Sequence, residues 1–318
     1  MMKMLILSVF TFFLGFSAFS QNSQIGTKEV DHSSLEINAS YSSNSGIDGI
    51  MNSVSAQPIT ASEINYYGSK GLLFGLSGQL IGNSNSSTIT KPSTEVDLTG
   101  GWNLNLWKSA LTVCPSYSHF FISSGAATAK SMFSDQAEVD VSGSFNWFKP
   151  SVTTDYLFGS KKALNFNFSL GFEARVKNFL SEGNSLVLNP SIGANYGNLS
   201  WSYLVPKNLL QFLTPLRVTY GDNLTIQQLL AKGTAVVKKA NEKQMAILNP
   251  SSTLGEIFAP ATGYQLNSLE LTLPFTYSMN NLSLTSEFAL SIPKNVPNYI
   301  RSKTLFLFSA GISYSFDM

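Results

Sequence analysis

The sequence carries little charge, few histidines and one cysteine. Asp, Glu, Lys and Arg together make up 12% of its 318 residues, roughly half the share usual in soluble domains. The single cysteine, Cys114, excludes an intrachain disulfide, and one cysteine with 2 histidines makes a structural zinc site a poor explanation of the fold. The formal net charge of +1 indicates neither a nucleic-acid partner nor an acidic one.

Long apolar runs are also missing after the N-terminal segment, so no transmembrane helix is predicted in the rest of the chain. Lys3, the apolar run 4–16 and the small residues Ala18 and Ser20 are typical of a secretory signal peptide. The run is shorter than the ~20 residues of a spanning helix, and no neighbouring cysteine could carry a lipoprotein anchor. We therefore predict a signal peptide over 1–20 and a loose periplasmic lead over 21–33.

The chain is instead rich in aromatic residues, and its apolar and polar residues alternate. It contains 23 Phe and 12 Tyr, and apolar and polar residues alternate from about residue 34, as in β-strands. In 164–174 the even positions are apolar and the odd ones are mostly polar. Every such strand has one face that is apolar from end to end, which disfavours a secreted β-sandwich with polar outer faces. Without spanning helices, a membrane protein must close its sheet into a barrel.

The alternation predicts an all-β fold over 34–318: a transmembrane antiparallel up-and-down β-barrel of about twelve strands, with a partly helical extracellular insertion. If both termini are periplasmic, the short turns and the long loops fall on opposite sides of the membrane, which is the asymmetry expected of such barrels. The expected periplasmic turns are 68–71, 107–109, 148–150, 181–184 and 279–281. The expected external loops are 43–57, 82–92, 123–135, 198–263 and 292–302.

The last predicted strand, 304–316, ends in Tyr314-Ser315-Phe316. In this the sequence resembles the outer-membrane β-barrel proteins of Gram-negative bacteria, whose final strand ends in an aromatic residue. The resemblance implies an outer-membrane location in contact with lipid and lipopolysaccharide. It also implies periplasmic chaperones and the barrel-assembly machinery as partners during biogenesis, with Tyr314 and Phe316 as the assembly signal. Aromatic residues near strand ends are expected in the membrane girdle: Trp102, Trp107, Trp147, Tyr196 and Tyr277.

The segment 198–263 departs from the alternation. Thr225 is a candidate N-cap for a helix, and a shorter helical turn is expected over 208–213. A segment this long is usually functional when it is folded. We predict an external cap or a plug in the barrel mouth, and a pair of surface helices without a ligand is the alternative.

The parity of each strand predicts which charged side chains face the lumen. Mostly acidic side chains do, and these candidate pore-lining residues are Glu95, Asp97, Glu138, Asp140, Asp155, Glu173, Arg175, Glu270 and Glu287. Carboxylates in a narrow lumen would favour cations. They could instead pair with basic residues of the insertion and leave the barrel blocked. The pairs Glu95/Asp97 and Glu138/Asp140 could bind a divalent cation, but a hydrated acidic rim is the simpler interpretation, and no metal or cofactor is predicted.

His119 raises a different hypothesis. It lies on the lipid-facing parity near the external end of its strand, where a serine such as Ser123 or Ser124 beside it would fit acyl transfer. The sequence shows no Asn or Asp that would orient the ring, and a histidine at headgroup level among aromatic residues is the alternative. The leading prediction is therefore a porin-like passive channel for small solutes, with a preference for cationic ones, and not an enzyme. A non-conducting scaffold that binds partners through its extracellular loops ranks second, and an outer-leaflet lipid hydrolase ranks third.

Overall fold

A computed structural model describes the chain over residues 33–43, 46–47, 50–51, 58–81, 93–107, 109–122, 133–198, 207–231, 249–258, 263–296 and 304–318. The predicted signal peptide and nearly all of the predicted lead lie outside these ranges. Within them, no helix is both long and apolar enough to cross a membrane.

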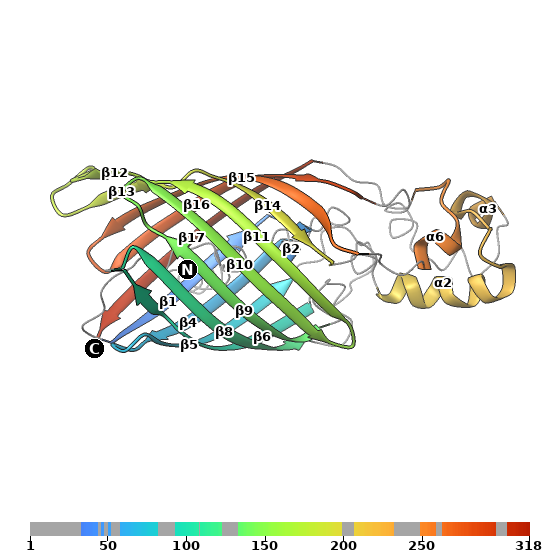
Figure 1. Ribbon diagram of the computed structural model, residues 1–318, viewed down its shortest axis with the longest axis horizontal. Coiled ribbons are helices and arrows are strands. Elements are labelled where there is room, and N and C mark those ends of the chain that lie inside the picture. Colours follow the sequence, from blue (N-terminus) through green and yellow to red (C-terminus); the bar gives the residue numbers. More distant parts are fainter. Residues whose placement is uncertain are drawn as a thin grey trace, which may run out of the picture.

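All the described strands except β2 and β3 form one antiparallel sheet that closes on itself (Figure 1). Twelve strands make its wall: β1 (Ser34–Ser42), β4 (Ile59–Tyr67), β5 (Leu72–Ile81), β6 (Ser93–Trp102), β8 (Leu111–Ile122), β9 (Phe133–Gly143), β10 (Phe148–Gly159), β11 (Lys162–Phe172), β14 (Ser191–Gly197), β15 (Gln265–Met279), β16 (Leu282–Pro293) and β17 (Leu305–Asp317). Shorter pieces continue three of them beyond local breaks: β7 (Leu104–Leu106), β12 (Ala174–Lys177) and β13 (Ser185–Leu188). A separate two-stranded ribbon joins β2 (Gly46–Ile47) to β3 (Ile50–Met51).

The barrel closes between its first and last strands. β1 pairs with β17 along its whole length, from Ser34 opposite Asp317 to Ser42 opposite Ser309. Each of the other neighbours in the wall is the next long strand along the chain. The prediction of an up-and-down barrel of about twelve strands is therefore confirmed.

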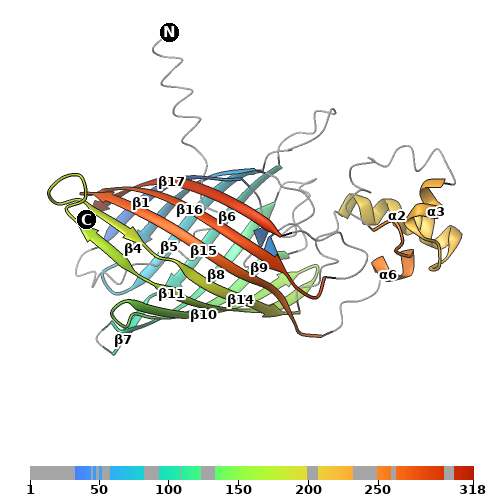
Figure 2. The same ribbon diagram turned by 90° about the horizontal axis from the view of Figure 1, so that it is seen from above.

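The two ends of the barrel differ. At one end, here called the short-turn end, the strands are joined by the short connections 68–71, 107–110, 144–147, 178–184 and 280–281, and the C-terminus lies there too (Figures 1 and 2). The opposite end, here called the loop end, carries the longer connections of the chain together with one short one, 160–161. Asn280 and Gly71 have positive φ angles in two of the short turns, and these residue types tolerate that conformation.

Two predicted boundaries are wrong. A turn was expected at 148–150 because of Pro150, but β10 already begins at Phe148 and the turn is 144–147. Pro150 pairs with Leu170 of β11, whereas the ladder to β9 begins only at Ser151. Its missing N–H therefore lies outside that ladder, where proline is tolerated. The loop expected over 123–135 is also too long, because β9 begins at Phe133.

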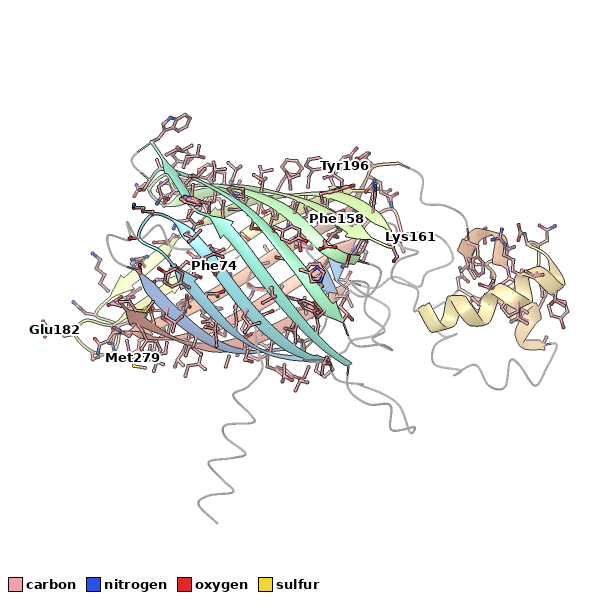
Figure 3. All side chains as sticks on the ribbon, turned by 90° about the horizontal axis from the view of Figure 1, so that it is seen from below. Phe74, Phe158, Lys161, Glu182, Tyr196 and Met279 are labelled. Atoms are coloured by element: carbon pink, nitrogen blue, oxygen red, sulfur yellow. The ribbon has the colours of Figure 1, made fainter. Side chains whose placement is uncertain are left out.

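The outer face of the wall is apolar. Alternate side chains of a barrel strand face outside and inside, and the exposed large hydrophobic residues follow the parity predicted to face lipid. Figure 3 shows Phe74, Phe158 and Tyr196 on this outer face. Other exposed apolar side chains on the same parity include Ile37, Ile64, Leu76, Leu98, Val139, Phe168, Leu271, Phe288 and Phe308.

Three helices form a small module at the loop end: α2 (Lys207–Tyr220), α3 (Ile226–Ala231) and α6 (Leu254–Phe258). Figures 1 and 2 show them beyond the barrel, on the side away from the C-terminus. Their contacts bury a few apolar side chains almost completely, namely Leu213, Leu216, Ile226, Leu229, Leu254 and Ile257.

The N-termini of α3 and α6 are built alike and bind each other. Thr225 and Gln228 form a capping box at α3, and Thr253 and Glu256 form one at α6. The Ile226 N–H donates to Ser252 O at 3.0 Å, and the Leu254 N–H donates to Leu224 O at 3.0 Å. The Thr225 cap is as predicted. The cap-or-plug role of 198–263 stays a prediction.

The predicted helical turn over 208–213 is too short, because α2 runs through Pro215 to Tyr220. Pro215 lies on the exposed side of α2, where water can satisfy the carbonyl group that loses its helix hydrogen bond. Helix α6 was not expected, since five residues are too few to show a helical period.

Candidate functional site

The inward parity of the wall lines the lumen with acidic and neutral polar side chains. The predicted pore-lining carboxylates all lie on this parity. Glu95, Asp97 and Asp155 are buried, whereas Glu138, Asp140, Glu173, Glu270 and Glu287 are partly buried. Neutral groups on the adjacent strand or on the same strand donate to several of them. Thr153 Oγ1 donates to Asp140 at 2.9 Å, and Ser268 Oγ donates to Glu270 at 3.1 Å.

Near the loop end, every wall strand contributes a buried inward side chain. We call this set the loop-end girdle, and it consists of Ser42, Ile59, Gln79, Glu95, Phe120, Gln136, Asp155, Asn165, Asn195, Ser268, Ser291 and Leu307. Toward the short-turn end, most inward side chains are only partly buried. Inward side chains are therefore more buried near the loop end than toward the short-turn end.

Gln136 links two carboxylates in the girdle region. Glu138 of β9 lies directly opposite Asp155 of β10 in the ladder, and like charges in that arrangement repel. Gln136 Nε2 donates to Glu138 Oε2 at 3.0 Å and to Asp155 Oδ1 at 2.7 Å. One amide group thus supplies a hydrogen to each acid and offsets part of their repulsion.

Asparagine side chains dominate the wall on β11, β14 and β15. Asn267 Nδ2 donates to Asn195 Oδ1 at 3.2 Å, and both side chains are fully buried. Asn165 is fully buried too, and its amide oxygen and nitrogen make no hydrogen bond within the described residues. It leans over Gly197, where an added Cβ would lie 2.2 Å from Asn165 Oδ1. The wall around Asn165, Asn195 and Asn267 is therefore lined by neutral amide groups.

Basic groups gather at the short-turn end. Lys149 Nζ contacts Glu173 Oε2, and Arg175 Nη2 lies 3.2 Å from Glu173 Oε1. Arg175 was predicted to line the pore and it remains half exposed. Lys149 was missed because a turn was expected at that position. Both cations are held by the same carboxylate.

The aromatic residues predicted for the membrane girdle lie on the outer face of the wall or in the turns at its edge. Trp102, Trp107, Trp147 and Tyr196 are exposed, and Trp147 stacks on Phe172 with ring centroids 5.6 Å apart. Tyr277 is partly buried and accepts a hydrogen bond from Asn184 Nδ2 at 2.6 Å. The predicted assembly-signal residues, Tyr314 and Phe316, are both exposed on the outward parity of β17. Their roles in anchoring and assembly stay predictions.

His119 has a partner that the sequence did not reveal. Its Nδ1 lies 2.7 Å from Oδ1 of Asp135 on β9, a residue placed by the prediction in a loop. The sequence shows that Asp135 is acidic, but it does not show which residue of the neighbouring strand lies opposite it. Elsewhere in the described ranges, no three His, Cys, Asp or Glu side chains gather closely enough to hold a metal ion.

No protein-family model matches the chain. No curated protein matches it either. Among solved structures, it is similar to a KdgM porin (10% identity, 88% of this chain and 99% of that chain, TM-score 0.43) and to a NanC porin (9% identity, 88% and 98%, TM-score 0.41). It is also similar to the COG4313 outer membrane channel from Pseudomonas putida F1 (8% identity, 90% and 95%, TM-score 0.42).

The closed antiparallel barrel with its apolar outer face is the architecture of the outer-membrane β-barrel class.

Proposed function

We propose that the chain is a porin-like passive channel for small solutes, with a preference for cations. The observation that carries this proposal is the composition of the inward wall of a closed barrel. Acidic side chains from most wall strands face the lumen, while Lys149 and Arg175 both bind one carboxylate, Glu173. Charges of one sign along a low-dielectric passage raise the local concentration of the opposite ion.

The loop-end girdle limits the size of such solutes. Twelve strands enclose a narrow lumen compared with the wider barrels of large porins. At the girdle, buried side chains from every wall strand form a ring, and a solute crossing the barrel has to pass this ring. This supports small ions and small polar solutes as the cargo.

Conductance in planar lipid bilayers tests the proposal. The mature protein should conduct current. In a salt gradient, its reversal potential should have the sign expected of a cation-selective channel. Glu138→Gln with Asp140→Asn should move that potential toward the value for no selectivity, most clearly at low salt where screening is weak. Thr285→Val, which changes an inward neutral residue, is the matched control. Current without cation preference would contradict the proposed selectivity. Absence of current would contradict the channel function itself.

A second candidate function is a non-conducting scaffold that presents its loop end to a partner. Two observations favour it: the burial of the side chains of the loop-end girdle, and the folded helical module that stands beyond the barrel. A deletion of 206–262 separates the two candidates. Current only after deletion means that the insertion blocks a real channel. No current from either form leaves the scaffold.

A further inference from the structure

The outer face of the wall carries a polar cluster on β8 and β9 that the channel does not use. His119 and Asp135 are direct neighbours in the β8–β9 ladder, on the parity that faces away from the lumen. They lie close to the loop-end limits of their strands, Ile122 and Phe133. Ionisable groups on a lipid-facing surface are costly and are functional candidates by default.

Three donors converge on the carboxylate of this cluster. His119 Nδ1 lies 2.7 Å from Asp135 Oδ1, Tyr117 Oη donates to the same oxygen, and Ser134 Oγ donates to Oδ2. The Asp135 side chain is only 15% exposed, whereas that of His119 is 38% exposed. The carboxylate is therefore held in place from several sides, and the imidazole is accessible from outside.

The hydrogen bond to Asp135 also selects the state of the imidazole. A carboxylate on Nδ1 favours the tautomer with its proton there, which leaves Nε2 as the basic nitrogen. His119 makes no hydrogen bond through Nε2 to a described residue. The edge of its ring meets Phe121 at 4.5 Å between centroids and 75° between planes, which restrains the ring.

The outer face around His119 and Asp135 carries apolar and aromatic side chains. Phe121 and Tyr156 are exposed on the same outer face, and Tyr156 stacks on Phe158 with centroids 5.5 Å apart. Acyl chains of the outer leaflet would lie against such a surface, because it is apolar and faces lipid. Ester groups of lipids lie at the boundary between acyl chains and headgroups, and a cluster near the end of the strands is placed to meet that boundary.

We propose that His119 and Asp135 form a water-activating dyad that hydrolyses ester bonds of outer-leaflet lipids. His119 Nε2 takes a proton from water as the water oxygen bonds to the ester carbonyl carbon. The acyl C–O bond then breaks, and the imidazolium returns the proton to the departing alkoxide. The products are a free fatty acid and a lipid with a new hydroxyl group. Water is the nucleophile because the hydroxyl of Ser134 is directed to Asp135 rather than to the imidazole. Asp135 is a positioning residue.

The test measures fatty acid released by purified full-length protein from two separate probes: phosphatidylethanolamine vesicles and lipopolysaccharide. Release from one probe and not the other identifies the source of the ester. His119→Gln should reduce the rate about 10²–10⁴-fold, the usual contribution of a general base. Asp135→Asn should lower kcat with KM unchanged, which a merely structural role would not produce. Tyr66→Phe, an outward tyrosine on β4 near the short-turn end, is the matched control and should behave like the unmodified protein.

Heat-modifiable gel mobility verifies that each variant forms the barrel. Release that persists in a folded His119→Gln variant would come from another source and would overturn the proposal. Absence of release from both probes by the unmodified protein would overturn it as well. Neither result bears on the conductance test, because the dyad lies on the opposite side of the wall from the lumen.

Discussion

Gln136 donates a 2.7 Å hydrogen bond from Nε2 to Asp155 Oδ1, and both side chains are essentially without solvent exposure. The same amide nitrogen also serves Glu138. A buried carboxylate that loses a donor suffers most of the desolvation penalty of its charge. This relationship links the charge of the lumen to the stability of the wall.

We expect Gln136→Leu to destabilise the barrel by about 1–3 kcal/mol, because two carboxylates each lose a donor. Urea unfolding in lipid vesicles, followed by tryptophan fluorescence, measures the change. Thr285→Val removes a hydroxyl from an inward residue that is exposed, and it should leave the unfolding midpoint almost unchanged. Equal midpoints for the two variants would show that the amide bridge contributes nothing.

Gly197 and Gly78 form a matched pair of wall glycines. A Cβ on Gly197 would lie 2.2 Å from Asn165 Oδ1 and 2.6 Å from the backbone oxygen of Leu164, whereas one on Gly78 meets nothing within 4 Å. Gly197→Ala should therefore lower stability by about 1–3 kcal/mol, the usual penalty of overpacking. Gly78→Ala should be neutral or slightly stabilising. The same urea titration compares them, and a tolerated Gly197→Ala would contradict the close contact.

Arg217 and Asp222 make the helical module sensitive to acid. Arg217 Nε and Nη2 donate to the two oxygens of Asp222 at 2.5 and 3.1 Å. These hydrogen bonds hold the pKa of Asp222 below its usual value. A carboxyl group with a lowered folded-state pKa stabilises the fold above its unfolded pKa of about 3.9, and that stability is lost as the pH falls through the folded-state value.

Amide hydrogen exchange over 213–229 in the full chain should therefore be steady from neutral pH to about pH 5, once corrected for intrinsic rates, and should accelerate in more acidic solution. Asp222→Asn should exchange faster at neutral pH and respond less to acid. Glu182→Gln, in the turn at the other end of the barrel, is the control. An identical acid response in Asp222→Asn would assign the effect to other groups.

The capping box at α6 should stabilise α3 as well as the five-residue helix α6. Thr253→Ala removes the hydroxyl that accepts from the Glu256 N–H at 3.2 Å, and loss of such a cap costs about 1 kcal/mol. Because α6 and α3 bind each other through their N-termini, protection should fall in both helices. Hydrogen exchange resolved to single helices checks this. Faster exchange in α6 alone would mean that the two caps act independently.

The prediction from sequence worked best where the signal was a period of two. The parity of β11 was read from alternating residues such as Phe168 and Asn167, and the exposed and inward sides agree with it. The approach failed where one residue type was taken as a boundary. Pro150 was expected to end a strand, yet it lies inside β10 at a point where its missing N–H is tolerated.

The sequence by itself determined which faces of the strands are apolar, roughly how many strands there are and which side chains turn inward, because these follow from local alternation along one segment. Only the tertiary structure decided which residues of different strands meet. Gln136 reaches Asp155, and His119 reaches Asp135, through a register that depends on the lengths of turns and loops. A shift of one residue in either ladder would turn one partner to the other face of the wall, so these contacts exist only when the neighbouring strands pair in this register.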